Sequence, residues 1–270
     1  MKSEEITAVT ENRRSFLKTA AASGLGLAAA GVLTRNIVSG ENKVEAAAYS
    51  NIDILNFALN LEYLEAEFYA VSTYGATLVT LGVISEADTT GPTTGGHMVP
   101  NFGKLPEASF ASAIRYDEIS HVKFLRSALG SAAAKKPAIN LNALGYGYAD
   151  IHSWLKLARQ FEDVGISAYL GGAPSLANNA TYLSAAAAIL ATEAQHSGTV
   201  RWSCIMNGVP SPAVDSHDVP PSPSQPFFVD GQALSIARTP AQVLNIVYHG
   251  GRCSGGFFPN GMNGSITCSS

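Results

Sequence analysis

Hydrophobic side chains recur at helical spacing along four long stretches of the chain. The stretches are residues 50–73, 107–129, 150–172 and 179–207. Apolar residues at i, i+3, i+4 and i+7 lie on one face of an α-helix, so each stretch predicts a helix with a buried stripe. Four such helices, joined by segments without this period, predict an all-α four-helix bundle.

Residues typical of helix termini stand at the ends of these stretches. Asp150 is a good N-cap for the third helix, and Asn178 or Asn179 can cap the fourth. Gly130 follows the second stretch, and Gly171-Gly172 ends the third. The boundaries of the predicted helices are therefore marked by residue type as well as by periodicity.

Three segments lack the helical period. Residues 75–105 are long for a connection within a bundle, so we expect an ordered excursion over one face. Residues 131–149 form a second connector, and residues 209–270 are rich in Pro and then in Gly, as expected of an extension that packs on the bundle. Within that extension, Thr239-Pro240-Ala241-Gln242 is a capping box with Pro at N1, which predicts a short fifth helix running to about Tyr248.

Residues 1–48 are typical of a targeting segment. Arg13-Arg14-Ser15-Phe16-Leu17-Lys18 precedes an apolar run from Thr19 to Leu33, and Ala46-Ala47-Ala48 follows. This order predicts a secretory signal, and the paired arginines resemble the bacterial twin-arginine type. A membrane anchor is the alternative, although the run is shorter than the roughly 20 apolar residues that a span needs. We expect an exported, periplasmic or extracellular protein with no stable membrane span after processing, its bundle formed by residues 49–208.

Two glutamates, Glu62 and Glu162, lie within the apolar rows of the first and third predicted helices. An unpaired carboxylate in such a row would be costly, so each needs compensating positive charge. Tyrosines follow seven residues on, at Tyr69 and Tyr169. The matching spacing indicates a twofold repeat of a helix pair.

The second and fourth predicted helices each carry a Glu-x-x-His motif. Glu118 and His121 form one, and Glu193 and His196 form the other. At i and i+3 a carboxylate and an imidazole lie on one helix face, where both can reach the same metal ion. Residues 49–270 contain eight Glu and six His, so roughly 0.2 such pairs would arise by chance. Two pairs on predicted buried rows indicate a metal site rather than solvated Glu–His pairs.

These features resemble the ferritin-like superfamily, whose bundles carry one Glu on each of two helices and Glu-x-x-His on the other two. More narrowly, residues 56–69 resemble exported ferritin-like proteins related to plant desiccation-related and fungal stress-response proteins. The predicted helix at 239–248 and the Gly-rich residues 255–261 resemble their C-terminal signature. The resemblance covers about residues 50–265.

The resemblance implies a dinuclear site that holds two Fe or two Mn ions. Six positions match the family's ligands: Glu62, Glu118, His121, Glu162, Glu193 and His196. Among them Glu118 and Glu193 match the bridging carboxylates, and the two histidines match the imidazole ligands, one per metal. Four carboxylates and two neutral imidazoles balance two divalent cations, a donor set suited to Fe or Mn alike.

Three further residues stand near this set. Tyr69 and Tyr169 are candidate hydrogen-bond donors to the ligands or radical traps, and a core aromatic with a satisfied hydroxyl is an equal interpretation. Glu65 is either a spare ligand or base beside the site, or a partly exposed carboxylate at the seam of the bundle. Glu67 falls well around the helix from Glu62 and is expected in solvent.

The remaining composition bears on packing and partners. Trp154 and Trp202 are expected to pack in the core, as is Cys204 in its apolar helical run. Cys253 and Cys268 lie in the Gly-rich tail, where a disulfide would staple the chain after export. The net charge is −4 and no basic stripe is present, which argues against nucleic acid as a partner.

The sequence therefore favours an exported ferritin-like protein that performs redox chemistry on O₂ or peroxide, as a ferroxidase or a catalase/peroxidase in stress protection. The twin-arginine route, which is known to carry folded and often cofactor-loaded proteins, fits a metal site. The alternative is a non-catalytic cell-envelope binding or protective protein that keeps the bundle. The long loop, the tail and the export signal argue against a closed storage cage, whereas a homo-oligomer is left open.

Overall fold

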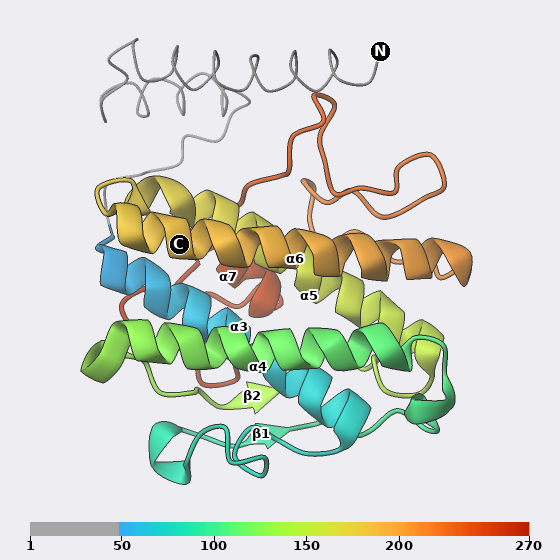
Figure 1. The fold of residues 1–270 in the computed structure, drawn as a ribbon, viewed down its shortest axis with the longest axis horizontal. Coiled ribbons are helices and arrows are strands. Elements are labelled where there is room, and N and C mark those ends of the chain that lie inside the picture. Colours follow the sequence, from blue (N-terminus) through green and yellow to red (C-terminus); the bar gives the residue numbers. More distant parts are fainter. Residues whose placement is uncertain (1–48, 270) are drawn as a thin grey trace, which may run out of the picture. The chain divides into compact units, whose positions relative to one another are not determined.

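A computed structural model describes residues 49–269 of the chain. Four long helices form an all-α bundle, as predicted: α3 (Asn51–Tyr74), α4 (Ala108–Leu129), α5 (Ile151–Gly172) and α6 (Ala180–Met206) (Figure 1). The predicted fifth helix is α7 (Pro240–Val247). Helix α3 packs chiefly against α4, and α5 packs chiefly against α6, so the bundle consists of two helix pairs.

The helix termini follow the capping residues of the sequence. Asp150 accepts a hydrogen bond from the backbone of Ser153, and Asn179 accepts one from the backbone of Tyr182. Thr239 forms the capping box predicted for α7. These side chains satisfy backbone N–H groups that have no partner within the helix, which is why the predicted boundaries agree with the structure to within a residue or two.

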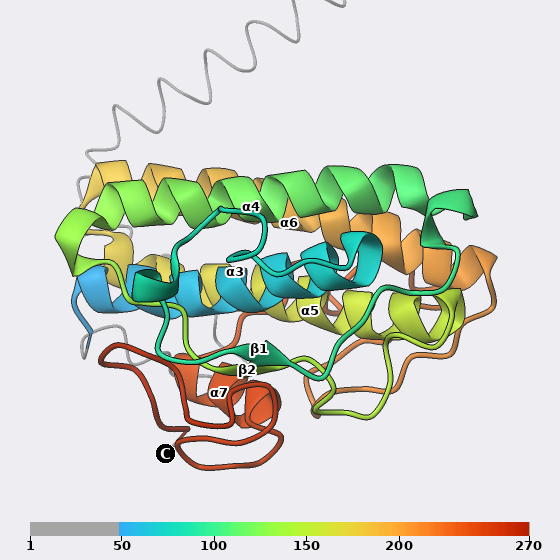
Figure 2. The same ribbon diagram turned by 90° about the horizontal axis from the view of Figure 1, so that it is seen from below.

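The two helices of each pair differ in burial. Every residue of α3 from Ile54 to Ser72 is buried, and α5 is buried almost throughout from Trp154 to Gly172. In α4 and α6 only one stripe is buried. Figure 2 shows α4 and α6 on one side, α3 and α5 in the middle, and the strand pair and α7 against the other side. We therefore call α3 and α5 the inner helices and α4 and α6 the outer helices.

The long connections cover α3 as an ordered layer. The α3–α4 segment contributes β1 (Thr93–Thr94), which pairs in parallel with β2 (Ile139–Asn140) of the α4–α5 segment. Beneath this layer, Glu67 is fully buried, accepts a hydrogen bond from the backbone of Leu78 at 3.2 Å and lies 3.8 Å from the Lys136 ammonium. The expectation that Glu67 is solvated is therefore wrong, because the loop layer supplies a cation and a backbone donor on that face.

Three buried arginines fasten the C-terminal extension to the bundle. Arg159 donates to the Pro212 carbonyl at 2.6 Å, and Arg201 donates to the Pro226 carbonyl at 2.7 Å. Arg238 belongs to the extension itself and donates to the Ser167 hydroxyl of α5 at 3.0 Å. Guanidinium groups bind several acceptors in a fixed plane, so the Pro-rich segment is held without secondary structure of its own.

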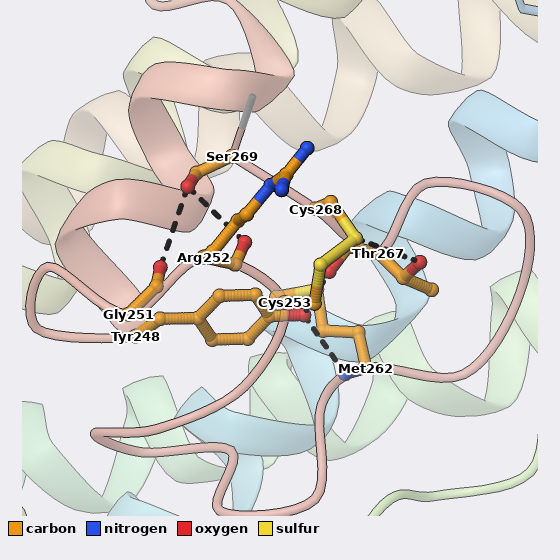
Figure 3. Close-up of a disulfide and its surroundings, with 8 residues drawn as sticks. All are labelled: Tyr248, Gly251, Arg252, Cys253, Met262, Thr267, Cys268 and Ser269. Atoms are coloured by element: carbon orange, nitrogen blue, oxygen red, sulfur yellow. Dashed lines mark hydrogen bonds between the residues drawn. A yellow bond between two sulfur atoms is a disulfide. The ribbon is translucent and has the colours of Figure 1, made fainter.

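The last part of the extension is stapled by a disulfide between Cys253 and Cys268, as expected (Figure 3). The Tyr248 hydroxyl lies between the two arms of this loop, donating to the Thr267 carbonyl at 2.9 Å and accepting from the Met262 backbone at 3.0 Å. The disulfide therefore closes a loop that is also folded around the end of α7.

Two further expectations have opposite outcomes. Trp154 is fully buried and donates to the Ser72 hydroxyl at 2.9 Å, and Cys204 is buried as well. Trp202 instead lies on the outer face of α6 with 56% of its surface exposed, so its assignment to the core is wrong. Trp202 directly follows the buried Arg201, and the next residue along a helix points about 100° away.

The targeting segment at 1–48 lies outside the described residues. Among residues 49–269, no helix combines the length and apolar character that a membrane span requires.

Candidate metal centre

The six residues that the sequence singles out converge at the middle of the bundle. Each inner helix contributes one glutamate, and each outer helix contributes a glutamate and a histidine. The set is Glu62, Glu118, His121, Glu162, Glu193 and His196. All four carboxylates are fully buried. Helical periodicity aims each side chain inward, and the bundle brings the four rows together.

The donor atoms form two overlapping groups of four. Glu62 and His121 complete the first group, Glu162 and His196 complete the second, and Glu118 and Glu193 belong to both. Within each group one donor atom per residue lies within 4.8 Å of the others. Shared carboxylates between two ligand groups are the arrangement that bridges a pair of metal ions.

Most of the oxygen and nitrogen atoms that could bind metal in this cluster are buried and have no hydrogen-bond partner. Both oxygens of Glu118 and Glu193, one oxygen each of Glu62 and Glu162, and Nδ1 of both histidines are unsatisfied in this way. Buried polar atoms are rarely left unpaired, so such a concentration calls for an occupant. Carboxylate oxygens and imidazole nitrogens that point at one another are the donor set for hard to borderline divalent metals. The residues present therefore fit a dinuclear metal site.

The electrostatics of the cluster favour added positive charge. Burial, together with the charge of Glu118, raises the pKa of Glu62 to about 7. Burial also opposes ionisation of Glu118, but the imidazoles of His121 and His196, whose Nδ1 atoms lie 3.5 and 2.9 Å from its oxygens, outweigh burial and lower the pKa of Glu118 to about 2. Although burial disfavours the imidazolium of His196, the adjacent Glu162 and Glu118 raise its pKa to about 12. The cluster as a whole thus attracts positive charge, which in the absence of metal is supplied by protons on the histidines and on Glu62.

The tyrosines of the internal repeat connect the two inner helices. Tyr69 on α3 donates a hydrogen bond to Glu162 on α5, and Tyr169 on α5 donates to Oε1 of Glu62 on α3 at 2.5 Å. Each tyrosine therefore fixes the carboxylate of the opposite helix and leaves its other oxygen facing the cluster. Both tyrosines are also buried core aromatics with satisfied hydroxyls, so the structure is compatible with both interpretations.

Comparison with known proteins agrees with this geometry. The family model of the ferritin-like domain matches residues 50–204, which is more than half of the chain. The chain belongs to the ferritin-like domain family. A curated relative, the ferritin-like catalase Nec2 of Nesocodon mauritianus, is 24% identical over 268 aligned residues, covering 80% of this chain and 85% of the relative. The family and the buried cluster together indicate a metal-binding ferritin-like protein.

Glu65 is buried beside the ferritin-like ligand set, so its alternative placement at a partly exposed seam is wrong. Space for its carboxylate comes from Gly165 of α5. A Cβ atom at Gly165 would lie 2.9 Å from Oε2 of Glu193 and 3.0 Å from Oε1 of Glu65. Burial and the neighbouring Glu193 raise the pKa of Glu65 well above its usual range, which favours the protonated form of this carboxyl.

Two carboxylates close to the centre were missed by sequence reasoning. Asp117 Oδ2 lies 3.1 Å from Nε2 of His196, and Asp163 accepts a hydrogen bond from the Ser197 hydroxyl at 2.6 Å. Both aspartates stand directly beside a ligand in the chain, Asp117 before Glu118 and Asp163 after Glu162. Their position next to a ligand in the sequence is a signal that could have been used. Consecutive side chains on a helix point about 100° apart, however, so the partner of each aspartate depends on which neighbouring helix it faces.

Proposed function

We propose that this protein is an exported dinuclear ferritin-like enzyme that removes peroxide, in the manner of a catalase. The two overlapping ligand groups that share Glu118 and Glu193 carry the proposal. They would hold two ions, which we assign to Fe or Mn on the chemistry of the donors. The similarity to a ferritin-like catalase supports peroxide as the substrate.

Different residues of the chain would have different roles in such a site. In catalase chemistry one peroxide is reduced to two waters and a second is oxidised to O₂, and a pair of redox-active ions supplies the two electrons that move. Glu118 and Glu193, which belong to both ligand groups, would hold both ions, and Glu62 with His121 and Glu162 with His196 would complete the two positions. Tyr69 and Tyr169 donate hydrogen bonds to Glu162 and Glu62, respectively, and so keep the carboxylate of each inner helix in place. The buried surroundings exclude bulk water.

The proposed cell compartment is outside the cytoplasm, in the periplasm or the medium, where peroxide removal would serve stress protection. The twin-arginine-like residues Arg13-Arg14 motivate export, and the disulfide Cys253–Cys268 fits an oxidising compartment. A fusion of residues 1–48 to a reporter that functions only after folded export tests this assignment, with Arg13→Lys plus Arg14→Lys as the matched control.

The central experiment measures metal and activity on the same sample. After aerobic reconstitution of the folded protein with Fe(II) or Mn(II), we expect about two ions per chain and release of O₂ from hydrogen peroxide. The double variant His121→Ala with His196→Ala should retain its helical content but lose both. Fewer than about one ion per chain in the unmodified protein contradicts the proposal. Two bound ions that oxidise Fe(II) but leave peroxide intact would assign a ferroxidase instead.

A further inference from the structure

The two halves of the metal centre repeat the ligand set, but they differ at the residue directly before each Glu-x-x-His motif. Each Glu-x-x-His motif is preceded directly by another residue, which is Asp117 before Glu118 and Thr192 before Glu193. Under the twofold repeat of helix pairs these two residues correspond. A carboxylate and a hydroxyl differ in charge and in hydrogen-bonding capacity, so the two halves are chemically unequal at this position.

Asp117 supports the imidazole of His196 from behind. Nδ1 of His196 faces the ligand carboxylates, at 2.9 Å from Glu118 and 3.5 Å from Glu162. The opposite nitrogen, Nε2, lies 3.1 Å from the Asp117 carboxylate. A carboxylate that accepts the N–H of a ligating imidazole fixes the tautomer, holds the ring in position and makes the other nitrogen a stronger donor to metal.

No residue in the described part of the chain gives His121 such support. Its Nδ1 lies 3.2 Å from Glu62 and 3.3 Å from Glu193, which matches the orientation of His196. Among residues 49–269, however, no group pairs with its Nε2. The corresponding residue Thr192 donates to the Ala188 carbonyl of its own helix at 3.3 Å. The His121 side chain is also the more exposed of the two, at 11% against 6%.

We infer that the two metal positions are unequal, and that Asp117 is the positioning residue that makes the His196 position the tighter one. The position of His121 is then the exchangeable one, which loads last and loses its ion first. This inference rests on the proposed dinuclear site and deepens it, because it assigns an order of loading to two positions that the ligand set alone leaves equivalent.

The test separates the two positions by removing one histidine at a time. His121→Ala leaves the His196 position intact, and His196→Ala leaves the His121 position intact. Each is prepared as the full chain without metal, with and without Asp117→Asn, and titrated with Mn(II) while the free ion is followed by electron paramagnetic resonance. We expect Asp117→Asn to weaken binding about 10- to 100-fold in the His121→Ala background and less than about twofold in the His196→Ala background.

A second comparison uses the intact ligand set and the natural asymmetry. The unmodified protein should bind two Mn(II) ions in two resolved steps, and Asp117→Asn should merge them by weakening the first. Thr192→Asp, which places a carboxylate at the corresponding position, should tighten the second step. Asp117→Glu keeps the carboxylate and should therefore bind the first Mn(II) ion more tightly than Asp117→Asn does. A merely structural role of Asp117 would not produce this recovery. Since Asp117 is 40% exposed, thermal unfolding of the metal-free variants should be unchanged.

Three outcomes overturn the inference: equal affinities in the unmodified protein, equal weakening by Asp117→Asn in both backgrounds, or no weakening in either. Equal weakening would mean that the negative charge acts at a distance rather than through His196. A protein that binds neither Mn(II) nor Fe(II) overturns the metal site itself. A protein that binds two ions with unequal affinities but does not consume peroxide overturns only the proposed activity.

Discussion

The inner and outer helices obtain their stability from different sources. Inner helices α3 and α5 are covered on all sides, by the outer helices on one side and by the loops and extension on the other. Outer helices α4 and α6 bury one stripe each and leave aromatic residues such as Tyr116 and Trp202 exposed. Polar groups on the back of an inner helix must therefore find protein partners, whereas those on an outer helix find water.

The largest effect is expected at Asp163, on the back of inner helix α5. Its carboxylate accepts from Arg201 at 2.5 Å and from Ser197, and it lies 3.5 Å from Arg159. Asp163→Ala leaves two buried guanidinium groups short of a partner and should cost about 3–5 kcal/mol in the free energy of unfolding. Urea unfolding of the metal-free protein measures it. A loss below about 1 kcal/mol would mean that the inner helices do not depend on these partners.

Smaller effects are expected at two helix glycines, and the two should have opposite signs. Gly165→Ala on inner helix α5 introduces a methyl group against Glu193 and Glu65, and should destabilise the protein by about 1–3 kcal/mol and weaken metal binding. Gly198→Ala on outer helix α6 meets no atom within 4 Å and should stabilise it by about 1 kcal/mol. Thermal unfolding and Mn(II) titration report both. The contrast between inner and outer helices fails if the two variants behave alike.

The inner-helix carboxylate Glu62 should make the centre sensitive to pH. Its folded-state pKa is raised from 4.5 to about 7, so the metal-free fold is favoured while this carboxyl is protonated. That contribution is complete below about 4.5 and is lost as the pH rises to about 7, because the unfolded chain releases the proton first. Metal binding needs the carboxylate, so ionisation of Glu62 should raise the affinity for Mn(II) about tenfold between pH 6 and pH 8, and release of protons from the histidines adds to this rise. A flat profile would contradict the assignment of Glu62 as a ligand.

The smallest effect is expected at Trp202 on the outer face of α6. Because 56% of its surface is exposed, Trp202→Ala should change the free energy of unfolding by less than about 0.5 kcal/mol. The measurement is again urea unfolding, at several protein concentrations. A larger loss that grows with concentration would show that this outer face is buried in an assembly of several chains.

The sequence by itself determined the four helices, their caps and the inward direction of six candidate ligands. Helical spacing is a local property, so Glu62 and Glu162 could be placed on buried rows and Glu118 and Glu193 paired with their histidines before any tertiary contact was known. The disulfide Cys253–Cys268 could be anticipated from the tail that contains it. These features depend on residues close to one another in the chain.

Only the tertiary structure decided the partners of polar groups that face away from those rows. Glu67 meets Lys136 across 69 residues of chain, and Asp117 meets His196 across 79, distances at which no periodic pattern carries information. The fate of such a group depends on whether a loop, an extension or solvent covers its face. Helices α3 and α5 became inner helices because the irregular segments pack on them, and that packing placed Glu67 and Asp163 in the interior while Trp202 remained outside.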